Sequence, residues 1–120
     1  HYEDGYVTTM LDYQKICDIA AAPHFTYRDK DVFDMAFLEW DNTARYREKA
    51  TIYKGCTPPI FEKNFRRLVQ KAEQKPEGRR FVYINAWNEW AEGTYLEPDE
   101  KNGYGYLEAV QRVMRERTQN

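Results

Sequence analysis

Two carboxylates, Glu89 and Glu92, lie three residues apart in the string NEWAEG, which follows an apolar run. A helical turn at this point would place their Cβ atoms about 5–6 Å apart. Retaining glycosidases hold their two carboxyl groups about 5–5.5 Å apart. Two acids this close cannot both ionise easily, so one of them keeps its proton at higher pH and becomes a usable proton donor. The spacing is therefore compatible with chemistry at a glycosidic bond.

Polar and aromatic side chains follow two apolar runs, at the points where each run ends. The first run ends in EWDNT and the second in NAWNEWAEG, and all three tryptophans of the chain lie at these two ends. In parallel α/β folds, functional groups collect where strands end. Flat rings stack on the apolar face of a sugar, while carboxylates and amides bind its hydroxyl groups. The candidate substrate-binding residues are Trp40, Asp41, Asn42, Asn88, Trp90 and Glu97.

The same residues have simpler interpretations, which the sequence leaves open. Glu89 and Glu92 could face solvent on a loop, as most pairs with this spacing do. Asp41 could cap a turn. Trp87 and Trp90 could fill the core, and for Trp87 that is the better interpretation.

Other polar residues are weaker candidates. A cation could bind near Glu97, Asp99 and Glu100, but these do not follow the order of an EF-hand loop. His24 follows a proline in a loop, so we expect a structural or surface role for it. Glu39 lies in an apolar run and is expected to point away from the sheet or to pair with an arginine.

Hydrophobic periodicity predicts three helices and two strands that would position these residues. Apolar residues at helical spacing, a proline at the first helical position of the second helix and short apolar runs bounded by turn formers are the signals. The predicted helices are Thr9–Ala21, a helix that begins after Thr57 and ends at KPEG, and Tyr104–Arg117; the predicted strands are Met35–Trp40 and Arg80–Trp87, with a loop over 88–102.

The order helix, strand, helix, strand, helix is typical of repeated βα units with parallel strands. Two strands are too few for a stable parallel sheet. Further strands must therefore lie in the first third of the chain or outside it. A complete (β/α)8 barrel needs roughly 250 residues, so this chain of 120 residues would supply less than half of one.

Composition argues against several classes of partner. The chain has 18 basic and 20 acidic residues and a formal net charge of -2, without a basic patch for nucleic acid or an acidic membrane surface. Cys17 and Cys56 are far apart, and two reduced, partly buried thiols suit a cytoplasmic chain. We expect no membrane span and no signal peptide, although the chain begins with His1 and could be a piece of a longer protein.

The string INAWNEWAEGTYLEPDEKNGYGYLEAV, residues 84–110, closely resembles the closing segment of the WbsX-like proteins. These are bacterial proteins of surface-polysaccharide and O-antigen gene clusters, often called glycosyltransferases. WDNTAR (40–45) and GCTPPIFEKNF (55–65) resemble the preceding segments of that family, so the likeness extends from about Phe33 to Met114. The family is similar in turn to glycoside hydrolase family 99, endo-α-mannosidases with (β/α)8 barrels that carry a comparable NEWxEG string after the last strand.

This resemblance implies roles for individual residues. Glu89 would correspond to the base that activates the 2-hydroxyl of the sugar, and Glu92 to the acid/base that protonates the leaving oxygen. The 2-hydroxyl would then displace the leaving group, so no carboxylate of the protein becomes covalently bound. Asn88 would orient the first glutamate or bind substrate. That chemistry implies no metal and no nucleotide cofactor.

Sequence and resemblance together predict an α/β chain that forms the C-terminal part of a (β/α)8 TIM barrel, about its last two or three βα units. Residues 1–32 would be a helix and loop that lead into these units, and residues 33–120 would form them. The parent protein would act on glycosidic bonds of a bacterial surface polysaccharide (O-antigen or capsule) by hydrolysis or transglycosylation, and the isolated piece would be inactive.

Three alternatives stay open. The same acids could only bind hydroxyl groups, in a non-catalytic carbohydrate-binding or scaffolding module. The name of the resembled family suggests a nucleotide-sugar glycosyltransferase, but Gly93, Gly103 and Gly105 do not form a phosphate loop. An independently folded small α/β domain is the third alternative. A barrel fragment would instead expose strand edges and self-associate.

Overall fold

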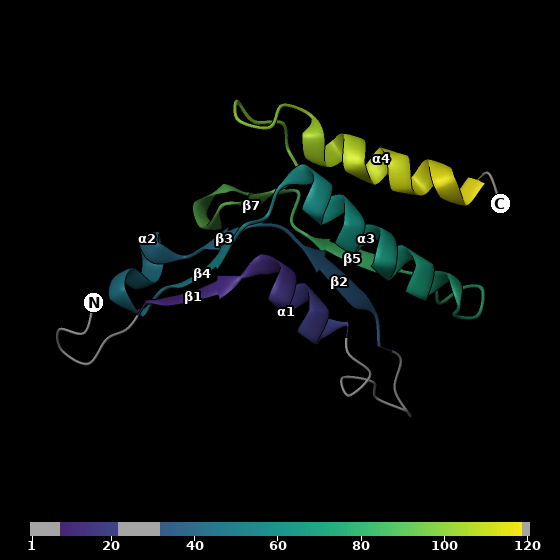
Figure 1. Ribbon diagram of the computed structural model, residues 1–120, viewed down its shortest axis with the longest axis horizontal. Coiled ribbons are helices and arrows are strands. Elements are labelled where there is room, and N and C mark those ends of the chain that lie inside the picture. Colours follow the sequence, from purple (N-terminus) through teal and green to yellow (C-terminus); the bar gives the residue numbers. More distant parts are fainter. Residues whose placement is uncertain (1–7, 22–31, 119–120) are drawn as a thin grey trace.

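Strands and helices alternate along the chain, and short strands and turns interrupt the regular pattern. The computed structural model describes residues 8–21 and 32–118 of the 120 (Figure 1). The strands are β1 Thr9–Asp12, β2 Asp34–Phe37, β3 Trp40–Asp41, β4 Thr51–Lys54, β5 Val82–Asn85, β6 Asn88–Glu89 and β7 Thr94–Tyr95. The helices are α1 Tyr13–Ala20, α2 Thr43–Tyr46, α3 Pro58–Glu73 and α4 Gly105–Thr118, with 3-10 turns η3 Arg47–Lys49 and η4 Trp90–Glu92.

The strands form three small sheets. β2 and β5 are parallel, with Ala36 opposite Ile84, and α3 lies between them in the chain. β1 pairs with β4 in parallel, and β3 pairs with the other edge of β4 in antiparallel orientation. β6 and β7 form an antiparallel hairpin. A mixed α/β chain with parallel strands joined through helices is thus confirmed.

The first predicted helix is too long at its N-terminal end. Residues 9–12 form strand β1, and the helix begins only at Tyr13. Asp12 caps it, since its Oδ1 accepts a hydrogen bond of 2.9 Å from the backbone N–H of Lys15. Before this cap, pairing with β4 holds the backbone extended. The prediction was wrong here because a strand partner distant in sequence overrides local helical spacing. His24 and the whole of the loop predicted around it, residues 23–31, lie outside the described residues.

The first predicted strand, Met35–Trp40, is divided. β2 ends at Phe37, and Trp40 and Asp41 pair with β4 instead. β4 itself was not predicted, because its four residues follow a charged turn and carry no strong apolar pattern. The second predicted strand is shorter than expected, and the predicted loop after it contains the β6–β7 hairpin.

The two longest helices and one face of the β2–β5 pair form the core. Phe61 of α3 is fully buried, and its ring stacks on Phe65 and meets Tyr106 of α4 edge-on, with both centroid distances 5.6 Å. Ala36 on β2 is also buried in this core. α3 begins at Pro58 as predicted, although the Thr57 side chain makes no capping bond. Figure 1 shows α3 beside β2 and β5, with α4 alongside α3 on the side away from these strands.

The opposite face of the β2–β5 pair carries large apolar side chains that are open to solvent. Met35 is 53% exposed and Tyr83, its partner in the register, is 58% exposed. Phe81, two residues before Tyr83, is 52% exposed. Successive side chains of a strand point to opposite faces, so these three lie on the face turned away from the core. Parallel sheets normally have both faces covered.

The two cysteines are free and buried, as predicted. Burial raises the pKa of the Cys56 thiol to about 12, so it is an unreactive thiol at neutral pH. Within residues 8–21 and 32–118, no helix is long and apolar enough to cross a membrane.

Candidate functional site

The Glu89–Glu92 pair lies on a tight hairpin that follows β5. Asn88 pairs with Tyr95 and Glu89 with Thr94, and the turn η4 connects the two short strands. Gly93 ends the turn with a φ of 66°, a left-handed conformation that suits glycine. In a 3-10 turn, side chains three residues apart lie on the same side. The local fold therefore brings Glu89 and Glu92 together.

Backbone and hydroxyl bonds attach this hairpin to the end of β5. The Thr94 hydroxyl donates to the Asn85 carbonyl at 2.8 Å, and Thr94 is fully buried. The backbone N–H of Leu96 donates to Ala86 at 3.0 Å, and the N–H of Glu97 donates to Trp87 at 3.1 Å. The acid pair is thus held on a supported loop at the carboxyl end of a parallel strand.

The two carboxyl groups are within hydrogen-bonding reach of each other. The hydrogen bond with Glu92 and the negative charge of Glu92 raise the pKa of Glu89, while the positive charge of Arg45 opposes this shift. Their surroundings differ, since Glu92 is 6% exposed and Glu89 lies open to solvent. One acid is therefore accessible and the other is shielded, in direct contact.

Arg45 is a site residue that our sequence reasoning did not single out. Its Nη2 lies 3.5 Å from Oε1 of Glu92, which makes an ion pair between α2 and η4. The only sequence signal is its position as the last residue of WDNTAR. Nothing local connects that string to Glu92, so only the fold reveals the contact.

Trp90 and Glu97 lie beside the acid pair and contact each other. The Trp90 ring stacks on Tyr95 with centroids 3.7 Å apart and planes 15° from parallel. Its Nε1 donates to Oε2 of Glu97 at 3.4 Å. Trp90 is 48% exposed, so it is not core filler. Burial, followed by a hydrogen bond to Asp99, raises the pKa of Tyr95 to about 12.

Trp40, Asp41 and Asn42 have structural contacts within their own segment. Asp41 accepts hydrogen bonds from the backbone and hydroxyl of Thr43, which hold its pKa below its ordinary value. Asn42 Oδ1 accepts a 2.7 Å bond from the backbone N–H of Thr51. The Trp40 ring lies 6.5 Å from the ring of Tyr53. These contacts agree with the interpretation of Asp41 as a turn cap. The same segment carries Arg45, which forms an ion pair with Glu92.

Trp87 is exposed to solvent at the end of β5. Trp87 is 53% exposed, so the expectation that it fills the core was wrong. It lies in the bend between β5 and β6, beyond the region that α3 covers.

Asp99 accepts hydrogen bonds from the backbone N–H of Asn102 and from the hydroxyl of Tyr95. Among the described residues, no three His, Cys, Asp or Glu side chains are grouped to hold a metal ion.

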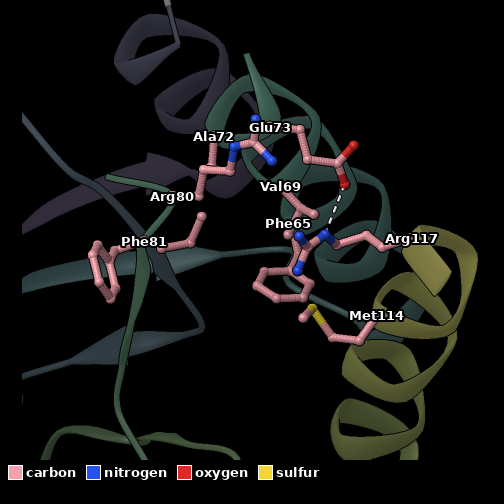
Figure 2. Close-up of a pocket in the computed structure, with 9 residues that line it drawn as sticks. Phe65, Val69, Ala72, Glu73, Arg80, Phe81, Met114 and Arg117 are labelled. Atoms are coloured by element: carbon pink, nitrogen blue, oxygen red, sulfur yellow. Dashed lines mark hydrogen bonds and ion pairs between the residues drawn. The ribbon is translucent and has the colours of Figure 1, made fainter. Parts of the chain in front are cut away.

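A hollow at the opposite end of β5 is separate from the acid pair (Figure 2). The ion pair between Glu73 and Arg117, at 2.9 Å, lies on its wall, and Figure 2 shows the Phe65 ring and the Met114 side chain below it. Its lining is formed by Phe65, Val69, Ala72, Glu73, Arg80, Phe81, Val82, Met114 and Arg117. Glu73 is the one acid in the lining of this hollow, so we do not include the hollow in the candidate catalytic site.

Comparison with known proteins gives the family. Residues 2–110 match the family described as Glycosyltransferase WbsX. Relatives from two strains of Xanthomonas campestris pv. campestris, both named uncharacterized protein WxcX, are 36% identical over 107 residues and 42% identical over 88. These matches cover 88% and 72% of this chain but only 15% and 13% of the relatives, so the chain spans a small part of their length. No solved structure matches. The match over residues 2–110 shows that the chain belongs to the WbsX glycosyltransferase family.

Proposed function

We propose that this chain carries the catalytic acid pair of a carbohydrate-active enzyme that acts on glycosidic bonds of a bacterial surface polysaccharide. The observation that supports this most directly is the contact between the carboxyl groups of Glu89 and Glu92. They share a tight turn beyond the carboxyl end of a parallel strand, where α/β enzymes place reacting groups. Membership of the WbsX family supports a carbohydrate substrate.

In the proposed reaction, one carboxyl group gives its proton to the leaving oxygen as the bond to the sugar breaks. The other, ionised, takes the proton of the sugar's 2-hydroxyl, whose oxygen attacks the anomeric carbon. Water or a hydroxyl of a second sugar then attacks the anomeric carbon and gives its proton to the first carboxylate, while the second carboxyl group returns its proton to the 2-oxygen as the bond from that oxygen to the anomeric carbon breaks. Water gives hydrolysis and a sugar hydroxyl gives transglycosylation, and each step balances without a metal or nucleotide.

The residues around the pair fit a sugar site. The Trp90 ring is half-exposed and held parallel to Tyr95, so it offers a flat apolar face. Asn88 and Glu97 lie on the same hairpin and its continuation. We assign these three residues to substrate binding. We also assign Trp40, Asp41 and Asn42 to the rim, where they hold the segment that carries Arg45.

We also propose that β2 and β5 are the last strands of a (β/α)8 barrel in a longer protein. Residues 33–120 would be its final βα units, with residues 1–32 leading into them. The exposed apolar face of Met35, Phe81 and Tyr83 supports this, because a closed parallel barrel would bury it. This chain matches only 15% of the length of one relative, so a longer protein of that size has enough residues for the other βα units. The isolated chain would then be inactive, because most of the substrate cleft would be missing.

The decisive experiment uses the full-length protein with Glu89→Gln and Glu92→Gln. Defined O-antigen and capsule oligosaccharides serve as substrates, and released reducing ends and transfer products are measured. Each variant should lose turnover by roughly 10²–10⁴-fold, as expected for loss of general acid or base catalysis, while sugar binding stays largely intact. Glu100→Gln, an exposed acid nearby, is the matched control and should keep wild-type turnover.

The family name favours a second candidate, a nucleotide-sugar transferase. The same reactions are therefore run with UDP-, GDP- and TDP-sugar donors, and release of free nucleotide is measured. Nucleotide release that is unaffected by Glu89→Gln would support the transferase. A wild-type protein without turnover, in which both glutamine variants bind sugar less tightly, would instead indicate a binding module.

A further inference from the structure

Trp90 lies on the turn that carries the acid pair, and its ring is held in place although it is half-exposed to solvent. We propose that Tyr95 and Asp99 are positioning residues that hold the Trp90 ring as a platform for the apolar face of a sugar, and so set the affinity for the saccharide. Neither residue has a role in the proposed function, on which this assignment rests. The platform concerns binding, whereas the acid pair concerns cleavage of the glycosidic bond.

Two contacts fix the Trp90 ring. Tyr95 covers one of its faces, with ring centroids 3.7 Å apart and planes 15° from parallel. Glu97 accepts a hydrogen bond of 3.4 Å from Trp90 Nε1, which fixes the edge of the ring. Trp90 is nevertheless half-exposed. Since one face lies against Tyr95, the exposed surface includes the opposite face, which is flat and open to a ligand.

Tyr95 is itself held, so it can support the ring in front of it. It belongs to strand β7, and its hydroxyl donates a 2.8 Å hydrogen bond to Oδ2 of Asp99. Asp99 is fixed in turn, because its Oδ1 accepts from the backbone N–H of Asn102 and its backbone exchanges two hydrogen bonds with Gly103. Contacts therefore continue without interruption from the turn after Asp99, through Tyr95, to the Trp90 ring.

The hydrogen bond between Tyr95 and Asp99 persists at neutral pH. Burial, followed by the hydrogen bond to Asp99, raises the pKa of Tyr95 to about 12, so the phenol keeps the proton that it donates. Burial opposes the ionisation of Asp99, but the bonds from Asn102 and Tyr95 hold its pKa below its ordinary value, so it remains an acceptor. The support of the Trp90 ring is therefore complete at the pH at which sugars are bound.

Trp87 provides a comparison that favours a role in binding. It lies on the same loop and is about as exposed as Trp90. Within the part of the chain that the structure describes, no aromatic ring stacks on Trp87. Exposure alone therefore does not require a second ring behind an indole. A ring of fixed orientation loses little conformational freedom when a ligand stacks on it, so the support of Trp90 favours binding.

The contacts also restrict what the platform can bind. The Trp90 N–H is already used by Glu97, so the indole offers a flat face and not a hydrogen-bond donor. The complementary surface is the C–H face of a pyranose ring. A carboxylate has about four lone-pair sites, so Glu97 can accept a sugar hydroxyl as well as the indole N–H. The platform thus fits a pyranose that presents one apolar face and a hydroxyl group at its rim.

The test measures binding and turnover separately in the full-length protein, with the same O-antigen and capsule oligosaccharides. Kd is measured by calorimetry in the Glu92→Gln background, and KM and kcat are measured in active protein. Tyr95→Leu removes the ring behind Trp90 and should raise Kd and KM about 3–10-fold, the range expected for loss of an aromatic pair. The value of kcat should change less than about twofold, because lost ground-state binding leaves kcat unaffected.

Conservative variants test the link to Asp99. Tyr95→Phe and Asp99→Ala remove the same hydrogen bond, so each should raise Kd and the double variant should raise it no further than the larger single effect. Asp99→Asn keeps an acceptor oxygen and should restore most of the affinity that Asp99→Ala loses. Trp87→Leu is the matched control, at an equally exposed indole without a stacked ring, and should leave Kd and KM unchanged.

The outcomes separate the platform from the proposed function. If Tyr95→Leu leaves Kd and KM unchanged, the platform is wrong, even if the glutamine variants abolish turnover. A kcat that falls as far as KM rises would also contradict it, because Tyr95 would then only maintain the hairpin that holds the acids. If Tyr95→Leu does not fold, as judged by urea unfolding, the pair Tyr95→Phe and Asp99→Ala decides. A Kd that depends on Tyr95 in a protein without turnover would support the platform and contradict the enzymatic proposal alone.

Discussion

Arg45 Nη2 lies 3.5 Å from Glu92 Oε1, and this ion pair joins the short helix after β3 to the turn after β5. Glu92 in turn contacts Glu89, so three charged groups from two distant segments interact. The pair of acids is a product of the local turn, whereas the contact of Glu92 with Arg45 depends on a segment distant in the sequence.

Glu89→Gln should stabilise this chain at neutral pH. The folded-state pKa of Glu89 is raised above its ordinary value of 4.5. Its contribution to stability is therefore complete below pH 4.5 and is lost as the pH rises through the raised pKa, when Glu89 ionises beside Glu92. Glutamine keeps a hydrogen-bond donor and cannot ionise. Urea unfolding at pH 7 and pH 4 should show a gain in free energy of unfolding at pH 7 that disappears at pH 4.

Glu100→Gln is the control for this pH dependence, since Glu100 is an exposed acid on the loop that follows. It should change the free energy of unfolding little at either pH. An equal effect of Glu89→Gln at pH 7 and pH 4 would show that the contact between the acids does not perturb Glu89.

Trp90→Ala should destabilise the hairpin. The Trp90 ring stacks on Tyr95 at 3.7 Å, and such aromatic pairs contribute about 0.5–1.5 kcal/mol beyond area burial. We therefore expect a loss of about 1 kcal/mol in the free energy of unfolding, measured by urea denaturation. Trp87→Ala, at a similarly exposed tryptophan, should cost less. Equal losses would mean that the stack contributes nothing specific.

Asn42→Ala should both destabilise the chain and release Arg45. The change leaves the backbone N–H of Thr51 without its 2.7 Å acceptor, a loss of about 1 kcal/mol for a half-buried bond. Because Asn42 anchors the segment of Arg45, the Glu89 titration, followed by NMR of a 13C label at its carboxyl carbon, should also move to higher pH. Asn42→Asp retains the acceptor oxygen and is the matched control. If Asn42→Ala loses stability but leaves the Glu89 titration unchanged, the bond of Asn42 to Thr51 does not hold Arg45 beside the acid pair.

Met35→Lys and Tyr83→Lys distinguish a barrel fragment from an independent domain. Both residues lie on the exposed apolar face of the β2–β5 pair. In this chain alone, lysine at either position should reduce self-association in sedimentation velocity, while the chain stays folded. In the full-length protein, the same substitutions should lower stability sharply, because that face would be buried in the barrel.

Tyr104→Lys is the control for that comparison, because Tyr104 is 64% exposed and precedes α4 away from this face. It should leave association unchanged. A full-length protein that tolerates lysine at position 83 would contradict the barrel. A wild-type chain that sediments as a monomer would support the independent domain.

The sequence predicted those features that depend on neighbouring residues. α3 begins at Pro58 and buries Phe61 and Phe65 as the helical spacing indicated, since the periodicity and the proline are both local signals. The contact between Glu89 and Glu92 was predicted for the same reason, because a spacing of three residues places two side chains on one side of a turn.

The remainder depended on partners distant in the sequence. Residues 9–12 are a strand because β4 pairs with them, although their spacing also fits a helix. Trp87 is exposed because α3 covers only one region of the β2–β5 pair. The spacing of three residues in the sequence predicted that the two acids would meet, provided that the loop begins with a turn. Only the tertiary structure placed Arg45 beside the buried one, since an ion pair between separate segments requires the fold to bring them together.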